Sequence, residues 1–424
     1  MSEKLEQKPP VESQSLVGAV EVPTSLPRQT LGQLLRGDLG FLPVLLTLIA
    51  IVLYFAITTQ GLFLKPINIS NLFQQIVTIG IDSLGVTLVL LLGEVDLSIA
   101  AVGTFSAVVM GVTLERMGFP AATAIIAGIL TGALAGAING FFTAVLRIPS
   151  FIVTLAASIF YTGAELYLLG GQETLIIHNP AVVSIAGGPY SFLPDVYGVG
   201  IPTVILILYV LGLLLDYRMR RQRGLRTKSF LQLGGQIALA VVLVEGSILV
   251  LQNTPGPTPG TFLGVPNNVA IFFGLLLIIW LVVKKTTFGR HIYAVGGNAE
   301  AARRAGINVV MIRIVVFTLC SALAAVGGIL ASSRATAVAS QINPALTLEA
   351  IAAAVIGGVS LFGGRGSVWS IVLGALIIGS LENGLDLRSQ GSDIKQMIEG
   401  GVLVFAVTVD ALVRRAQARS SSGR

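Results

Sequence analysis

Residues 119–145 read FPAATAIIAGILTGALAGAINGFFTAV, a run of 27 residues without Asp, Glu, Lys or Arg. A helix rises about 1.5 Å per residue, and in lipid it must satisfy every backbone polar group internally, so about 20 apolar residues cross the hydrocarbon core. This run therefore predicts a transmembrane helix. The same criterion, applied outward along the chain, predicts eleven more.

The composition supports a chain that lies mostly in lipid. Hydrophobic residues make up 54% of the 424 residues and charged residues 11%, whereas a soluble domain carries about 25% charged residues. We therefore predict an all-α polytopic membrane protein of about twelve helices. The predicted spans are residues 40–59, 72–92, 97–114, 119–145, 150–169, 198–215, 230–251, 266–283, 311–332, 346–361, 367–382 and 396–413.

The distribution of basic residues predicts the orientation, because Lys and Arg accumulate in cytoplasmic loops. With the N-terminus inside, 22 of the 27 Lys and Arg residues fall on the cytoplasmic side. Residues 1–37 are polar, rich in Pro, Ser and Gln, and lack the apolar core of a secretory signal. We predict a disordered cytoplasmic tail over 1–37, a transmembrane domain over 38–415 and a second cytoplasmic tail over 416–424, so that both termini are cytoplasmic.

The opening run also predicts a close helix contact. Its glycines at Gly128, Gly132, Gly136 and Gly140 are spaced by four and share one helix face. Small residues on a face let another helix approach closely. We expect this contact to lie within the chain rather than between subunits, with Asn139 either bonding across it or facing a pathway.

Two loops resemble each other. Residues 93–98 read GEVDLS and residues 357–362 read GGVSLF, and they match at three positions. Each lies between two apolar segments, on the same predicted side of the membrane. Internal repeats are common in transporters, so the match suggests two related halves.

Several kinds of chemistry are excluded by what the sequence lacks. No lysine follows a glycine, so there is no P-loop, and any ATP must be hydrolysed by a partner. The two histidines, His178 and His291, are predicted on opposite sides of the membrane, which argues against a zincin or a Ser/His hydrolase. Cys320 is the one cysteine and lies in an apolar run. We predict neither an enzyme, nor a metal or organic cofactor, nor a nucleic-acid partner.

The most informative loop is predicted to be cytoplasmic and spans about residues 285–310. Residues 287–308 read TFGRHIYAVGGNAEAARRAGIN. Gly296 and Gly297 predict a flexible turn, Asn298 is a good N-cap, and Ala299 to Ala305 favour a short helix. Gly306 stands where a left-handed cap is wanted. A short capped helix between two spans is a plausible docking element, and the simpler alternative is a solvated loop.

This loop resembles the coupling loop of the ribose/xylose/arabinose family of ABC importer permeases. Other marks of that family occur in the family's order, and the resemblance covers about residues 40–415. These marks are EVDLS at 94–98, PSFIVTLA at 149–156, LEAIAA at 348–353, GGVSL at 357–361 and ENG at 382–384.

An added hairpin indicates one branch of this family. Members with ten helices have less chain before the coupling loop, whereas here residues 198–251 form an extra hairpin with a basic connector, RMRRQRGL, at 218–225. That connector is similar to the one in the xylose branch. The resemblance therefore implies D-xylose or a related pentose as the solute.

The resemblance also implies partners and site residues. It implies a permease homodimer in the bacterial inner membrane, a separate ABC ATPase on the cytoplasmic side, and a periplasmic or extracellular sugar-binding protein on the other. The residues expected to couple to the ATPase are Asn298, Glu300, Ala301, Ala302, Arg303, Arg304 and Gly306.

Polar groups at membrane depth are candidates for the translocation pathway, because they are costly there and usually face a bundle interior or a cavity. For each carboxylate, a helix-to-helix hydrogen bond or a cap explains the residue equally well. Buried carboxylates also act as proton relays, so a proton-coupled secondary transporter of a small polar solute is the main alternative, and a receptor-like protein is a third. The candidates are Glu94 and Asp96, near a membrane edge, with Asn139, Glu165 and Glu349, and Asp82 and Glu245 are further carboxylates at membrane depth.

Overall fold

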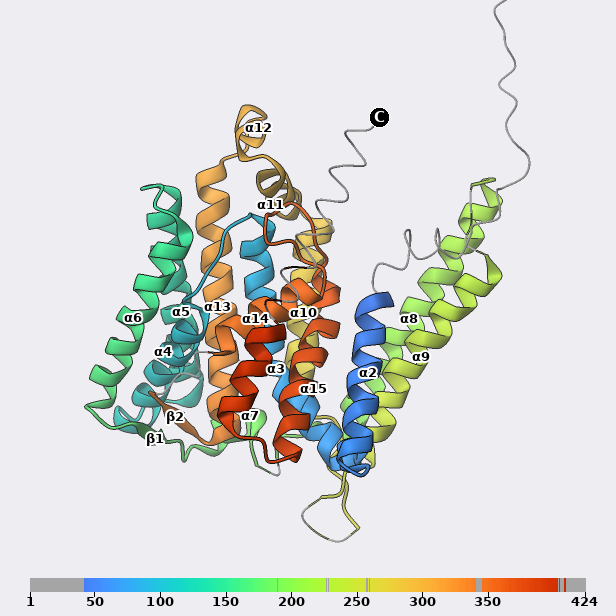
Figure 1. Cartoon of the computed structure of the whole chain (residues 1–424), viewed down its shortest axis with the longest axis horizontal. Coiled ribbons are helices and arrows are strands. Elements are labelled where there is room, and N and C mark those ends of the chain that lie inside the picture. The colour runs from blue at the N-terminus through green and yellow to red at the C-terminus, as the bar shows by residue number, and fades with distance from the viewer. Residues whose placement is uncertain are drawn as a thin grey trace, which may run out of the picture. The chain divides into compact units, whose positions relative to one another are not determined.

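The structure, a computed structural model, describes residues 42–402 except 189, 226, 228, 257, 259 and 341–344, and also residues 404 and 408. From Pro43 onward they belong to one compact unit. This part of the chain is almost entirely helical (Figure 1). The predicted tails, 1–37 and 416–424, lie outside it.

The elements follow one another as helices joined by short connections. Two three-residue strands, β1 (Thr174–Ile176) and β2 (Ala337–Ala339), pair antiparallel. The helices are α2 (Leu42–Thr58), α3 (Pro66–Leu91), α4 (Ile99–Gly111), α5 (Ala121–Ala144), α6 (Ser150–Leu169), α7 (Pro180–Ala186), α8 (Asp195–Gln222), α9 (Phe230–Gln252), α10 (Asn267–Lys285), α11 (Thr287–Gly297), α12 (Ala299–Arg304), α13 (Val309–Ala335), α14 (Ala345–Ile356) and α15 (Ile371–Leu387), with short helical turns η1 (Leu62–Leu64), η2 (Val112–Arg116) and η3 (Val368–Ser370).

The predicted fold class is confirmed. Within the described ranges, nine helices are long and apolar enough to cross a membrane, and α2 and α14 are shorter apolar helices. The segment predicted at 346–361 ends early as a helix, because Gly358 leaves the helical region with a φ of +91°. The last predicted span, 396–413, is described only in part, and a helix over residues 392–402 covers its beginning.

The glycine face of α5 packs against α13, as the spacing predicted. A Cβ on Gly132 would lie 2.6 Å from Ala325 Cβ, and one on Gly136 would lie 2.6 Å from Ser321 Cβ and overlap the Phe317 carbonyl oxygen. Gly140 meets Ile314 in the same way. The close contact is therefore within the chain, and it places α13 beside α5 along its length.

The predicted extra hairpin is present as α8 and α9. Ser229 begins α9 with a capping box, in which its side chain accepts from the Gln232 backbone and the Gln232 side chain accepts from the Ser229 backbone. These two helices are the least buried of the nine, and exposed Leu, Ile and Val side chains cover them. Apolar, exposed surfaces of this kind suit contact with lipid.

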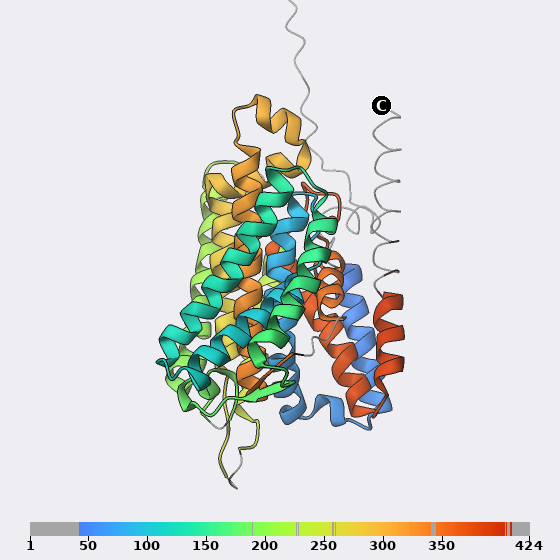
Figure 2. The ribbon, with the colours of Figure 1, turned by 90° about the vertical axis from the view of Figure 1, so that its left-hand side faces the viewer.

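The two ends of the bundle differ. In Figure 1, β1, β2 and α7 lie at one end, and α11 and α12 lie at the other. The orange segment around α12 extends beyond the neighbouring helices (Figure 2). This agrees with the prediction that His178, which precedes α7, and His291, which is in α11, lie on opposite sides, whereas which side is cytoplasmic stays a prediction.

Candidate coupling site

A tight turn connects α10 to α11. The Thr286 side chain accepts a hydrogen bond of 3.3 Å from the Gly289 backbone and caps α11. A Cβ on Gly289 would overlap the Val283 carbonyl oxygen. Glycine is therefore required here by the close approach of the two helices, which holds α11 against the end of α10.

The helix α11 was not predicted. Gly296 and Gly297 were expected to make a flexible turn, but they form its last two residues. Ile292 and Val295 are buried on its inner side. The expectation was wrong because a glycine pair at the end of a helix looks, in sequence, the same as a pair in a loop.

The short helix α12 has both caps that the sequence predicted. Asn298 Oδ1 accepts a 2.9 Å hydrogen bond from Ala301 N–H. At the other end, Gly306 has a φ of +85°, and the N–H groups of Gly306 and Ile307 donate to the carbonyls of Arg303 and Ala302, both at 3.0 Å. This pair of bonds is a Schellman motif. The helix ends at Arg304, one residue earlier than expected.

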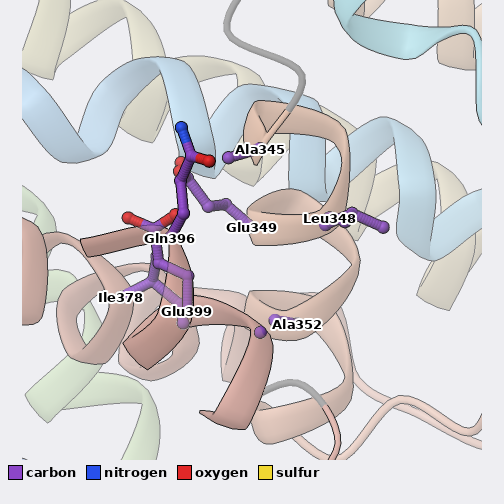
Figure 3. A pocket seen from close by; sticks show the side chains of 8 residues that line it. Ala345, Leu348, Glu349, Ala352, Ile378, Gln396 and Glu399 are labelled. Atoms are coloured by element: carbon purple, nitrogen blue, oxygen red, sulfur yellow. The ribbon is translucent and has the colours of Figure 1, made fainter. Parts of the chain in front are cut away.

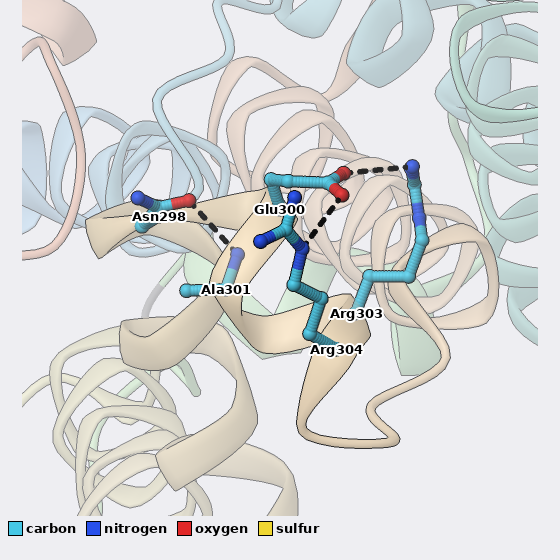
Figure 4. A network of polar contacts seen from close by, with 5 residues as sticks. All are labelled: Asn298, Glu300, Ala301, Arg303 and Arg304. Carbon is cyan, nitrogen blue, oxygen red and sulfur yellow. Dashed lines mark hydrogen bonds and ion pairs between the residues drawn. The ribbon is translucent and has the colours of Figure 1, made fainter.

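One face of α12 is anchored and the other is exposed. Ala302 is 5% exposed and belongs to the main apolar core. Glu300 binds Arg303 at 3.1 Å and Arg304 at 3.3 Å, and all three side chains are more than half exposed (Figure 4). Exposed pairs of this kind contribute only about 0.3–0.5 kcal/mol each. The outer face is therefore a charged surface on a fixed base, open to a partner.

Four glycines join α11 to two distant loops, and we call Gly93, Gly296, Gly363 and Gly364 the glycine junction. A Cβ on Gly296 would overlap the Leu91 carbonyl oxygen and lie 2.8 Å from Gly364 N. A Cβ on Gly363 would lie 2.8 Å from both Gly296 O and Gly93 N. The three backbone segments can approach this closely because glycine has no side chain.

Hydrogen bonds hold the junction together. Gly364 N–H donates to Leu91 O at 2.9 Å, and the Tyr293 hydroxyl of α11 donates to Gly366 O at 2.9 Å. Burial raises the pKa of the Tyr293 phenol, which favours its protonated, donating form. The end of α3 and the glycines after residue 362 therefore contact α11, and Gly93 joins them through Phe362 and Gly363.

An ion pair links the first of these loops to α13. Glu94 Oε1 lies 2.9 Å from a terminal nitrogen of Arg313, and both side chains are largely buried. Arg313 is in the second turn of α13, which follows α12 directly. Glu94, a candidate for the pathway, thus lies at the coupling end of the bundle.

The structure brings two other candidates together. Asp96 Oδ1 accepts hydrogen bonds from Ser98 N–H at 2.8 Å and from the Ser98 hydroxyl at 2.6 Å. The same hydroxyl accepts from Asn139 Nδ2 at 3.0 Å. All three residues are at most 3% exposed. Asn139 therefore bonds across a helix contact, and Ser98, which the sequence analysis did not single out, connects it to Asp96.

The same loop is fixed to α6. Val95 N–H donates to Ser150 Oγ at 3.2 Å, and Leu97 N–H donates to Thr154 Oγ1 at 3.0 Å. Both hydroxyls belong to the PSFIVTLA motif. This motif thus serves to satisfy the backbone of an irregular loop that is buried among helices.

The remaining candidates, Glu165 and Glu349, stand apart from this network. Glu165 is on α6 and Glu349 on α14, and these helices are well separated in Figure 1. Among the described residues, both oxygens of Glu165 and one of Glu349 are buried without a hydrogen-bond partner. The predicted pathway residues therefore do not form one cluster.

Known proteins are similar to this chain over most of its length. The family described as the permease component of the branched-chain amino acid transport system matches residues 68–407. The xylose transport system permease protein XylH of Escherichia coli strain K12 is 36% identical over 87% of this chain and 91% of its own. No solved structure matches the chain.

Relatives named for other sugars are also similar. The fructose import permease protein FrcC of Rhizobium meliloti is 30% identical over 92% of this chain and 91% of its own. The ribose import permease protein RbsC of Bacillus subtilis is 30% identical over 82% and 86%. The chain therefore belongs to this family of multi-pass membrane permeases, which includes the sugar import permeases of bacteria.

Proposed function

We propose that the chain is the membrane subunit of an ATP-driven ABC importer for a monosaccharide, D-xylose or a related pentose. It forms the translocation pathway as a homodimer, receives sugar from a periplasmic or extracellular binding protein, and couples to a separate ATPase. The observation that carries the proposal is the pairing of 36% identity to a xylose permease with an exposed, capped α12 on a rigid base.

The coupling step follows from the contacts of α12. Its charged outer face, Glu300, Arg303 and Arg304, seats in the ATPase. When the ATPase dimer closes on ATP, it displaces α12, and α11 moves with it because Ala302 and Ile292 are held in the same apolar core. Backbone contacts at the glycine junction then transmit this movement.

The junction passes the movement to two loops at once. One loop, after α3, is tied to α13 by Glu94 and to α5 through Asp96, Ser98 and Asn139. The other, after α14, moves through Gly363 and Gly364. A single displacement of α11 therefore acts on both of the similar loops, as an alternating-access transporter with related halves requires.

A proton-coupled secondary transporter is the second candidate, because Glu165 and Glu349 have buried carboxyl oxygens that find no partner in the described part of the chain. Carboxylates of that kind serve as proton relays. An exposed, charged α12 has no role in such a mechanism. The two candidates differ in whether α12 is needed.

Two separate proline variants of α12, one at Ala302 and one at Ala299, test the proposal. Ala302 N–H donates to Asn298 O at 2.9 Å, and proline at 302 removes that bond and clashes with the preceding turn, at a cost of about 3 kcal/mol. Ala299 is the first helical residue, where proline is favoured, and Asn298 before it is already extended. We expect Ala302→Pro to insert into the membrane but to lose sugar uptake and sugar-stimulated ATP hydrolysis.

Ala299→Pro is the matched control and should retain both activities. Full uptake and full stimulation by the loaded binding protein in Ala302→Pro would contradict the coupling role of α12. Uptake that persists without the ATPase but fails when the proton gradient is collapsed would favour the second candidate.

A further inference from the structure

A cavity of about 220 Å³ lies between α14, α15 and the helical residues 392–402. One wall is apolar and is formed by Leu348, Ala352 and Ile378. An engineered cavity of about 150 Å³ holds benzene. The space therefore suits a molecule of the size of a monosaccharide.

A buried carboxylate faces this cavity. Glu349 is 3% exposed and lines it. Its Oε1 has no hydrogen-bond partner in the part of the chain that the structure describes. A buried acceptor without a partner is costly, so the Glu349 carboxyl group, which lines the cavity, would be stabilised by a hydroxyl donor bound beside it.

Two further polar groups converge on the same place. Gln396 and Glu399 extend from the facing helix, and Figure 3 shows their polar ends close to that of Glu349. The nearby cation, Lys395, is paired with Asp386. The lining thus offers two carboxylates and an amide, which accept from and donate to hydroxyl groups, opposite an apolar wall.

This combination matches one chemical class. A neutral sugar has many hydroxyl donors and patches of C–H surface, and it needs no counter-charge. We propose that this cavity is a binding subsite for a neutral monosaccharide on its way through the membrane, with Glu349 as the main acceptor. The inference rests on the proposed function for the identity of the solute.

Two adjacent glycines allow a direct test. Gly400 lines the cavity and Gly401 does not, and a Cβ added at either meets nothing within 4 Å. In the purified full-length chain, Gly400→Cys and Gly401→Cys are labelled with a maleimide, with and without D-xylose. The native Cys320 is buried, so it contributes little background.

We expect D-xylose to slow the labelling of Gly400→Cys and to leave Gly401→Cys unchanged. Adding Glu349→Leu to Gly400→Cys should weaken the protection by about tenfold in sugar concentration, which corresponds to about 1.4 kcal/mol. Adding Glu349→Gln, which keeps an acceptor, should weaken it less. Glu245→Leu, a carboxylate of α9 that accepts from Thr203, is the control and should not weaken it.

Protection by Na⁺ or Ca²⁺ but not by D-xylose would overturn the inference in favour of a cation site, and no protection by any of them would overturn it as well. Transport separates this failure from failure of the proposed function. Gly400→Leu should reduce D-xylose uptake about tenfold while the loaded binding protein still stimulates ATP hydrolysis. Gly401→Leu should change neither, and equal uptake in the two variants would contradict the subsite.

Discussion

The glycine junction makes a sharp prediction through two neighbouring residues, Gly296 and Gly297. An alanine Cβ at 296 would overlap the Leu91 carbonyl oxygen and lie 2.8 Å from Gly364 N, whereas ordinary contacts are 3.4–4 Å. At 297, a Cβ meets nothing within 4 Å. Neither glycine has a positive φ, so the two substitutions differ in contact and not in backbone strain.

The magnitude follows from three effects. Overpacking costs about 1–3 kcal/mol, and separating Gly364 N–H from Leu91 O costs about 1 kcal/mol more. Replacing glycine by alanine in a helix returns about 1 kcal/mol in either variant. Gly296→Ala should therefore lose about 1–3 kcal/mol of stability, and Gly297→Ala should lose none.

Two assays on the purified full-length chain and its reconstituted complex check this. The apparent unfolding temperature of Gly296→Ala should fall by a few degrees. If about 1.4 kcal/mol of the strain opposes the movement of α11, the sugar-stimulated ATP hydrolysis of the complex should fall at least about tenfold. Gly297→Ala should match the native chain in ATP hydrolysis and should unfold at the same or a slightly higher temperature. Identical behaviour of the two variants would refute the close contact and its role in coupling.

Three further predictions concern the fold and the network. Gly136→Leu should lower the yield of folded protein on size-exclusion chromatography, because overpacking of α5 against α13 costs about 1–3 kcal/mol, whereas Gly163→Leu, which has open space around it, should be neutral; equal yields would contradict the contact. Ser98→Ala removes the hydroxyl that joins Asp96 to Asn139 and should lower the unfolding temperature by a few degrees, since it leaves buried polar groups without partners; an unchanged temperature would count against the network. A cysteine at Gly224 should be labelled only from the cytoplasm, because the basic residues place that loop inside, and labelling only from outside would reverse the predicted orientation.

Local patterns predicted much of the fold. The spans followed from the length of the uncharged runs, a close contact on the glycine face of α5 from glycines spaced by four, and the ends of α12 from Asn298 and Gly306. In each case the cause lies within one helix or at its cap. Sequence shows such causes directly, because the interacting positions are a few residues apart.

Contacts between distant segments could not be predicted. Glu94 pairs with Arg313, and Gly296 touches Leu91 and Gly364, but no pattern in a single sequence relates these positions. The strands β1 and β2 have three residues each, which is too short for the alternation of apolar and polar residues to be recognised. A Cβ on Gly187, which follows α7, would lie 2.5 Å from Ser333 O, because this connection packs on α13, and no local pattern shows that contact.

The pathway candidates show the same limit. A polar side chain in or near a predicted span identified Asp96, Asn139, Glu165 and Glu349. That criterion did not distinguish a residue that hydrogen-bonds to a loop from one that faces a cavity. Asp96 and Asn139 are engaged by Ser98, whereas Glu349 faces a space shared with Gln396 and Glu399. That difference depends on packing between helices.

The most direct test of the central claim is sugar uptake by proteoliposomes that contain this chain, its ATPase and the sugar-binding protein, with an ionophore present to collapse the proton gradient. The account predicts that D-xylose accumulates when ATP is supplied, and that accumulation stops when the ATPase is left out. Accumulation of D-xylose that does not depend on ATP but is abolished by the ionophore would contradict the account.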